Sequence, residues 1–320
     1  MKKRTKCLFL IGGILFLLGG MIFTGVMTMC RWDFSKFSTT KYETNSYEIR
    51  DPFGSIVIRT VTADIRFELS DDNTVSVVCH EETNIRHTVS VKDGALTVEA
   101  VDTRKWYEHI GISFDQTTVT VTLPRGTYGD LRIESGTGGT TIPEGLSFLN
   151  ADISETTGDI AFSASASGAL RLKTTTGDIR LADSTVGSAE LSLSTGDITV
   201  SDVTATGDLC VKVTTGATDV RNVRCLNFSS SGTTGDVTLT EVFATDALSV
   251  ARSTGNVHFD RAHAASMTVN TGTGSVTGSL AGEMIVFAQS GTGKIIVPRC
   301  TEGGRCDVTT GTWNILLSIG

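Results

Sequence analysis

The stretch KTTTGDIRL, residues 173–181, determines the fold because its central motif returns at a fixed interval. The same motif occurs in SETTGDIAF at 154–162 and in SLSTGDITV at 192–200, 19 residues away on either side. Aligned on the Thr-Gly pair, the chain shows ten units separated by 20, 19, 19, 20, 19, 20, 19, 19 and 18 residues. The units begin at Thr137, Thr157, Thr176, Thr195, Thr215, Thr234, Thr254, Thr273, Thr292 and Thr310. A period of about twenty residues predicts a solenoid, in which each unit forms one coil stacked on the next.

Each unit contains two short runs in which apolar and polar residues alternate. The first run follows the Thr-Gly pair directly, as in Ile179 and Leu181, and the second comes about ten residues later. Examples of the second run are Leu191 with Leu193 and Leu226 with Phe228. Alternation with a period of two predicts strands with one buried face, and the units show no helical spacing of 3.6. We therefore expect an all-β solenoid with two strands per coil and apolar side chains stacked in its interior.

The Thr-Gly-Asp motif itself is expected to form a corner of each coil. Glycine accepts backbone angles that other residues avoid, and aspartate can bond the amides of a turn. Asp159, Asp178 and Asp197 would then stack ~5 Å apart, and a cation such as Ca²⁺ would relieve their repulsion. The alternative is that each aspartate caps its own turn. We favour this alternative and expect no cofactor, because calcium-binding β-rolls carry a denser set of acidic ligands.

The first 31 residues differ from the rest. Four basic residues within MKKRTK precede the run CLFLIGGILFLLGGMIFTGVMTMC, which has 24 residues without a charge. Such a run can cross ~30 Å of hydrocarbon as a helix, and the basic residues before it place the amino terminus in the cytoplasm. A cleaved signal peptide is the alternative. We favour an uncleaved membrane anchor, because the run exceeds the usual ~7–15 apolar residues and MTMC lacks small residues for cleavage.

The charge of the remaining chain limits its partners. After residue 31 the sequence has 22 basic and 35 acidic residues, a net charge of −13. An acidic domain of this kind argues against binding to nucleic acid or to an anionic lipid surface. It is compatible with solubility outside a cell.

Four segments are expected along the chain. Residues 1–31 form a basic tip and transmembrane anchor, and residues 32–41 form a linker. Residues 42–133 alternate like strands, as in SIVIRTVTADIRFEL and HTVSVKDGALTVEAV, with looser spacing than the repeat. We interpret them as the wider first part of the same β structure, which residues 134–320 continue as the regular solenoid.

The cysteines and histidines offer few sites. Cys300 and Cys306 bracket TEGGR, a stretch that could close into a disulfide outside the cell. Cys210 is expected opposite Asn227 on an outward position, diagonal to Cys225 and at marginal distance for a bridge. The remaining external cysteine is predicted to be buried. The scattered histidines are predicted to be surface residues, and they are His80, His87, His109, His258 and His263.

One aromatic pair stands out in the stretch DTRKWYEHIGI. Trp106 and Tyr107 follow Arg104 and Lys105, and their rings could stack on a sugar or on a protein partner. The same rings could instead plug the first coil, and we favour this second interpretation.

The order of these elements resembles a known family. TVTADIRFELSDDNTVSV, VSVKDGALTVEA and VTVTLPRGTYGDLRIESGTG are followed by serial TTGDI units behind a membrane anchor. This arrangement is similar to the bacterial putative-adhesin β-strand-repeat family of unknown function, which is related in pattern to autotransporter-adhesin head domains. The resemblance implies a right-handed β-helix-like solenoid on the outer side of a cell membrane. It implies no catalytic residue, and it implies an association with cell-envelope stress systems.

Two functions remain open at this point. The chain could be a non-enzymatic, adhesin-like surface module that contacts cell-wall polymer or a surface partner. It could also be an accessory or sensor of a cell-envelope stress system that acts through a membrane protein partner. An enzyme is not expected, because the coils vary by at most two residues and leave no loop to wall a cleft. The sequence also lacks nucleophile-elbow, zincin, P-loop and dinucleotide motifs.

Overall fold

The computed structural model describes residues 3–29, 31–32, 41–104 and 116–320. A single helix, α1 (Lys3–Met29), precedes the strands. Its segment Leu10–Met29 has a mean hydropathy of 2.2 and is long enough to cross a membrane. By length and composition the helix fits either a single-pass anchor or a signal sequence.

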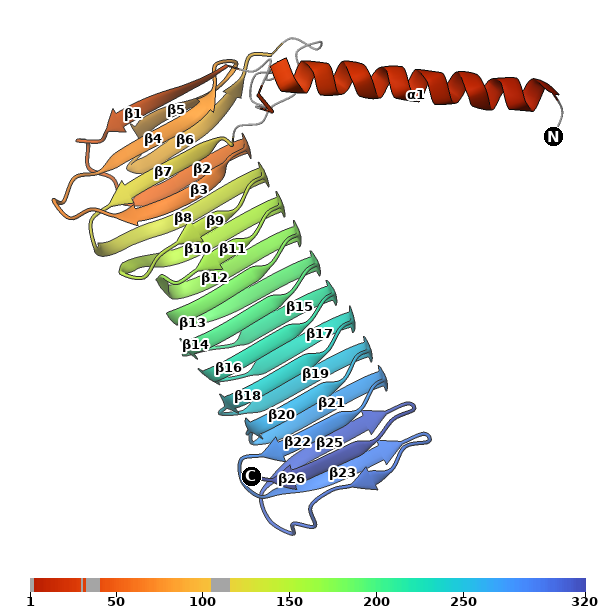
Figure 1. Cartoon of the computed structure of the whole chain (residues 1–320). Helices are drawn as coiled ribbons and strands as arrows, with labels where there is room; N and C mark the ends of the chain where they lie inside the picture. The colour runs from red at the N-terminus through yellow and green to blue at the C-terminus, as the bar shows by residue number, and fades with distance from the viewer. Residues whose placement is uncertain (1–2, 30, 33–40, 105–115) are drawn as a thin grey trace.

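All described strands belong to one 26-stranded sheet that winds into a long rod (Figure 1). In the first face of the rod, neighbours in space from the N-terminal end are β1 (Tyr42–Glu48), β4 (Ser76–Glu82), β7 (Thr118–Leu123), β3 (Asp64–Leu69), β9 (Thr140–Ile142), β11 (Ile160–Phe162), the first half of β13 (Ile179–Thr195), β14 (Ile198–Ala205), β16 (Thr218–Cys225), β18 (Val237–Ala244), β20 (Val257–Ala262), β22 (Val276–Leu280), β26 (Ile315–Ile319) and β24 (Ile295–Ile296). The all-β solenoid expected from the repeat is confirmed.

The second face packs against the first across a shared interior. Its strands, in the same direction along the rod, are β5 (Ile85–Lys92), β6 (Ala95–Asp102), β2 (Ser55–Thr62), β8 (Gly126–Thr137), β10 (Leu146–Thr157), β12 (Ser165–Thr176), the second half of β13, β15 (Leu209–Thr215), β17 (Phe228–Thr234), β19 (Ala247–Thr254), β21 (Ser266–Thr273), β25 (Gly304–Thr310) and β23 (Met284–Ser290). Within the described strands every pairing is parallel except β1–β4, β4–β7 and β5–β6. A hairpin at KDG joins β5 to β6 through Asp93 and Gly94, both at positive φ.

Apolar side chains from both faces form one continuous core that runs from Ile56 to Leu317. Successive coils place like residues in register, so that Ile179 pairs with Ile198 and Leu191 pairs with Val211. Each such side chain contributes ~1.5–3 kcal/mol by leaving water. One expected pair is wrong. Leu226 is exposed, because it lies in the bend between β16 and β17, whereas Phe228 and Ser230 occupy the inward positions of β17.

Glycine at the Thr-Gly-Asp corner is required by stacking as well as by backbone angle. Gly177 has φ +130°, and a Cβ on it would lie 2.1 Å from the carbonyl oxygen of Gly158 in the neighbouring coil. Gly216 has φ +145°, and its Cβ would lie 1.7 Å from the carbonyl oxygen of Gly196. The corner glycines therefore lie directly on one another's backbones, and no other residue fits.

A second bend recurs once per coil without a glycine. Its residue adopts φ between +50° and +57° in five successive coils, at Asp183, Asp202, Asn222, Glu241 and Arg261. The sequence pattern did not indicate this bend, because residues of different type occupy it.

At both ends of the rod the order in space departs from the order in sequence. At the N-terminal end, β2 and β3 lie between the coil β6–β7 and the coil β8–β9. At the C-terminal end, β25 lies between β21 and β23, and β26 lies between β22 and β24, so that β23 and β24 end the rod (Figure 1). The apolar C-terminal segment is thus covered by an earlier part of the chain.

Candidate functional site

The aspartates of the Thr-Gly-Asp corners form a hydrogen-bonded ladder. Asp159 Oδ1 accepts the backbone N–H of Asp178 at 2.8 Å, and Asp178 Oδ1 accepts that of Asp197 at 2.8 Å. Asp197 Oδ1 in turn accepts the N–H of Ala217 at 2.7 Å. Each carboxylate thus caps the corner of the next coil, which corrects the expectation that each aspartate caps its own turn. Within the described residues, these aspartates do not gather into a group of donors close enough to share a metal ion.

The five cysteines that follow residue 41 are free thiols in the structure, so it does not contain the disulfide predicted between Cys300 and Cys306. Cys306 points into the core from β25 and is 1% exposed, in register with Met267 and Val286. Its inward direction is set by the alternation of the strand, while Cys300 lies outside the described strands. The sulfur of Cys306 thus packs inside the apolar core.

The predicted register of the middle cysteines is wrong. Cys210 on β15 pairs with Ser229, two residues beyond the predicted Asn227. Cys225 ends β16 in the other face and is buried, so it does not lie diagonal to Cys210 on the surface. The aromatic pair Trp106 and Tyr107 lies outside the described residues.

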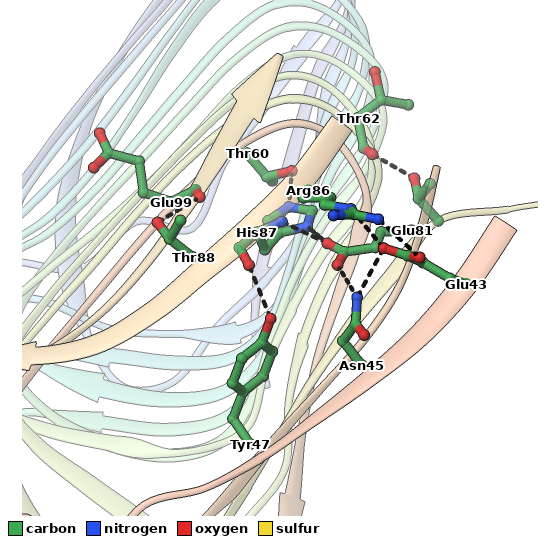
Figure 2. A network of polar contacts seen from close by, with 11 residues as sticks. Glu43, Asn45, Tyr47, Thr60, Thr62, Glu81, Arg86, His87, Thr88 and Glu99 are labelled. Atoms are coloured by element: carbon green, nitrogen blue, oxygen red, sulfur yellow. Dashed lines mark hydrogen bonds and ion pairs between the residues drawn. The ribbon is translucent and has the colours of Figure 1, made fainter. Parts of the chain in front are cut away.

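A buried polar cluster lies between the two faces at the N-terminal end of the rod, and Figure 2 shows two of its members, Glu81 and His87. Inward-facing Cys79 and Glu81 on β4 and His87 on β5 are 0%, 0% and 3% exposed. One donor atom from each residue lies within 4.8 Å of the other two. Because β4 and β5 belong to different faces, these three side chains connect the two walls of the solenoid.

Hydrogen bonds fix the orientation of this cluster. Glu81 Oε2 accepts His87 Nδ1 at 2.7 Å and the His87 backbone N–H at 2.5 Å. Glu81 Oε1 accepts the side-chain amide of Asn45 at 2.7 Å, and His87 Nε2 lies 3.0 Å from Thr60 Oγ1. Burial, followed by the charge of Glu81, raises the pKa of Cys79 to about 12. At neutral pH the thiol is therefore protonated and is a poor nucleophile.

Sequence reasoning missed this cluster, because His87 was predicted at the surface. The signal was present in VVCHEETNIRH, where alternation places Val77, Cys79 and Glu81 on one side of a strand. His87 follows the short turn at Thr83 and Asn84, which carries the chain from one face to the other. Cys79, Glu81 and His87 come together because β4 and β5 face each other across the interior without pairing, and the sequence does not report this.

A second titratable group is buried in the first regular coils. Glu155 is 3% exposed and accepts a hydrogen bond from Thr140 Oγ1, while its Oε2 has no partner among the described residues. Burial raises the pKa of Glu155 to about 7 against the lowering effect of Thr140, and the charges of Asp159 and Asp64 add to the rise. The same two aspartates, Asp64 and Asp159, line an open hollow of about 470 Å³ together with Arg66, Gln116 and Thr141.

The outer surface carries one uninterrupted column of threonines along the corners. Nine exposed threonines pair in register from coil to coil, and no hydroxyl of theirs bonds another group within the described residues. This threonine column consists of Thr62, Thr137, Thr157, Thr176, Thr195, Thr215, Thr234, Thr254 and Thr273. Strand spacing of ~4.8 Å sets the repeat of its hydroxyl groups.

The outward side chains of the second face change from charged to neutral along the rod. Near its N-terminal end, outward side chains alternate in charge, and Glu134 forms ion pairs with Arg59 at 3.1 Å and with Arg132 at 2.6 Å. Further along, Glu190 forms an ion pair with Lys212 at 2.7 Å. Beyond this pair the outward residues of β17, β19 and β21 are small and neutral, and they are Ser229, Ser231, Ser249, Ala251, Thr268 and Asn270.

The chain is similar to solved structures of putative adhesins from bacteria. A solved structure of a putative adhesin from Bacteroides fragilis is 16% identical, with a TM-score of 0.42 over 87% of this chain and 97% of that one. One from Parabacteroides merdae is 14% identical, with a TM-score of 0.45 over 88% and 98%. Among curated proteins no sequence matches this chain.

The sequence itself decides the family. The model of the family described as Toastrack DUF4097 matches residues 53–224 and 190–299, which is more than half of the chain. The resemblance drawn from the repeat is therefore confirmed. The chain is a member of the Toastrack DUF4097 family.

Proposed function

We propose that this protein is a non-enzymatic, membrane-anchored surface module that binds cell-wall polymer along its rod. The observation that carries the proposal is the threonine column, whose unbonded hydroxyls repeat at the strand spacing of ~4.8 Å. A regular row of donors and acceptors matches a polymer that repeats its own hydroxyl and amide groups. A folded protein partner, with its irregular surface, would not need nine equivalent positions.

Two features support a binding role over catalysis. The most chemically varied group of side chains in the described part of the chain is sealed between the two faces, so a substrate cannot reach Cys79 or His87. The hollow near Asp64 and Asp159 is open to solvent, which does not suit a reaction that must exclude water. In this proposal helix α1 is the uncleaved anchor and the rod lies outside the membrane.

Co-sedimentation of residues 32–320 with isolated cell-wall sacculi tests the proposal. The triple variant Thr195→Val, Thr215→Val and Thr234→Val removes three adjacent hydroxyls and keeps the β-branched shape. We expect it to pellet less than the parent chain. A matched control replaces Thr185 and Thr204, which are exposed and in register at another position of the coils.

The two variants and a chelator separate the outcomes. Equal loss in the column variant and in the control variant would contradict a role for the column. If the parent chain does not sediment, binding to cell-wall polymer is ruled out. The remaining function is then the accessory or sensor role through a membrane protein. We expect a chelator to leave binding unchanged, because Asp159, Asp178 and Asp197 serve as backbone acceptors.

A further inference from the structure

The donor set of the buried cluster is that of a metal centre. Cys79 offers a sulfur, His87 a ring nitrogen and Glu81 a carboxylate oxygen, all within 4.8 Å of one another. Sulfur and imidazole ligands together select zinc among the common divalent cations, and carboxylate oxygen is a frequent further ligand. We propose that these three side chains bind one zinc ion that joins the two faces of the solenoid at its N-terminal end.

The arrangement of His87 fits this role. Its Nδ1 faces Glu81 at 2.7 Å, so a metal ion would take the place of the proton that the two groups share. Its Nε2 lies 3.0 Å from Thr60 Oγ1 on β2, which holds the ring in one orientation. Metal-bound histidines usually have such a partner on the second nitrogen.

Glu81 is positioned in the same way. Asn45 on β1 donates to Oε1 at 2.7 Å and leaves Oε2 directed at the histidine. Tyr47 on the same strand donates its hydroxyl to the carbonyl oxygen of His87 at 3.3 Å. The two ligand-bearing strands are thus held by neighbours on β1 and β2, and the cluster exists before a metal arrives.

The other buried thiols show that burial alone does not produce this cluster. Cys225 and Cys306 are 4% and 1% exposed, and burial raises the pKa of each thiol to about 12. Neither belongs to a group of three metal donors within the described residues. Their neighbours in register include Ala244 for Cys225 and Met267 for Cys306, as expected for cysteines that only fill space.

A metal ion at this position would act as a clamp. β4 belongs to the first face and β5 to the second; β5 is the last strand of its face, and only β1 lies beyond β4. A bond from each face to one ion would tie both walls at the end of the rod where the chain enters. Binding energy of structural zinc adds to folding energy, so the clamp would stabilise this end selectively.

The test uses the full-length chain, purified in detergent, stripped with a chelator and then loaded with zinc or cobalt. We expect about one zinc per chain and, with cobalt, the absorption band of a thiolate–cobalt bond. Cys79→Ser should lose the band, whereas the matched variant Cys225→Ser should keep it. Thr60→Val should keep the band and weaken zinc binding ~10–100-fold, because it removes the partner of His87 Nε2.

The result that overturns the proposal does not depend on how the variants fold. If the parent chain, with its β spectrum intact, takes up neither zinc nor cobalt, the cluster is a hydrogen-bonded core element and no metal site. A cobalt band that survives both Cys79→Ser and His87→Gln would equally contradict the assignment, since the ion would then lie elsewhere.

Discussion

The regular coils and the N-terminal end of the rod satisfy their polar groups by different means. In the coils each corner is completed by the coil beside it, as when Asp178 Oδ1 accepts the backbone N–H of Asp197. At the N-terminal end no further coil is available, and β1, β4 and β5 enter antiparallel pairings instead. Here the inward residues include Glu81 and His87, which satisfy each other. In the middle of the solenoid each coil satisfies the polar groups of its neighbour, whereas the polar groups at the end must be satisfied by other side chains.

The largest effect is expected at that end. His87→Ala leaves the buried carboxylate of Glu81 without its main partner, and such a change costs about 3–5 kcal/mol of unfolding free energy. Urea unfolding in the presence of a chelator measures it without a contribution from metal. The control is His258→Ala, whose exposed ring lies 3.1 Å from Thr277 Oγ1. A loss no larger than in the control would show that the cluster does not hold the end together.

The next effect tests the stacked corners. Gly216→Ala places a Cβ 1.7 Å from the carbonyl oxygen of Gly196 at φ +145°, so the two coils must separate. We expect a loss of about 3 kcal/mol in unfolding free energy. Gly126→Ala is the control, because its Cβ would meet nothing within 4 Å, and it should change stability little. Equal effects of the two substitutions would mean that corner stacking is not required.

Glu155 predicts a dependence on pH. Its pKa is about 7 in the folded chain and 4.5 when unperturbed, so the folded state holds the proton more tightly. The stabilisation from this group should be full below about pH 4.5, fall as the pH rises to about 7, and stay absent above it, a loss of about 3 kcal/mol. Glu155→Gln should flatten this part of the profile, which thermal unfolding at a series of pH values would record. An unchanged slope between pH 4.5 and 7 would contradict the assignment to Glu155.

The smallest effect concerns a single rung of the aspartate ladder. Asp178→Ala removes the acceptor of the Asp197 N–H and should cost about 1 kcal/mol. Asp178→Asn keeps an acceptor oxygen and should cost less than half as much. If the two variants are equally destabilised in urea, the carboxylate charge, rather than the hydrogen bond, is what matters at this corner.

A buried arginine marks another departure from the apolar repeat. Arg252 is 4% exposed and fills the space over Gly232, where it donates to Ser230 Oγ and Thr218 Oγ1 at 2.9 Å each. Burial lowers the pKa of this guanidinium to about 10. The repeat alone would place an apolar residue here, as Val213 is placed two coils earlier.

The coils were predictable from the sequence because each one repeats the same inward pattern. Ile179, Leu181 and Leu191 are buried as the alternation requires. The pattern failed at Leu226, because a serine at 230 occupies an inward position and hides the true register. The pattern also did not predict the order of the coils at the two ends of the rod. A repeat indicates which residues stack on one another, but it does not indicate which coil lies between two others.

The candidate sites were less predictable for a related reason. The Asp159 column was found from spacing, but its bonding to the next coil depends on the stagger between coils. The cluster of Cys79, Glu81 and His87 depends on two strands that face each other without pairing, and local alternation does not report such facing. The threonine column was visible as the first letter of each motif, although its exposure and its unbonded hydroxyls required the fold.

The central claim is that binding follows the length of the rod, and an internal deletion tests it most directly. Removing residues 216–254 joins Thr215 to Gly255, keeps both ends, and removes Arg252 together with its partners. We expect this chain to fold as well as the parent chain and to bind sacculi more weakly, because the column has lost two threonines. Unchanged binding by the folded, shortened rod would contradict this expectation, because the contact would then not depend on the length of the threonine column.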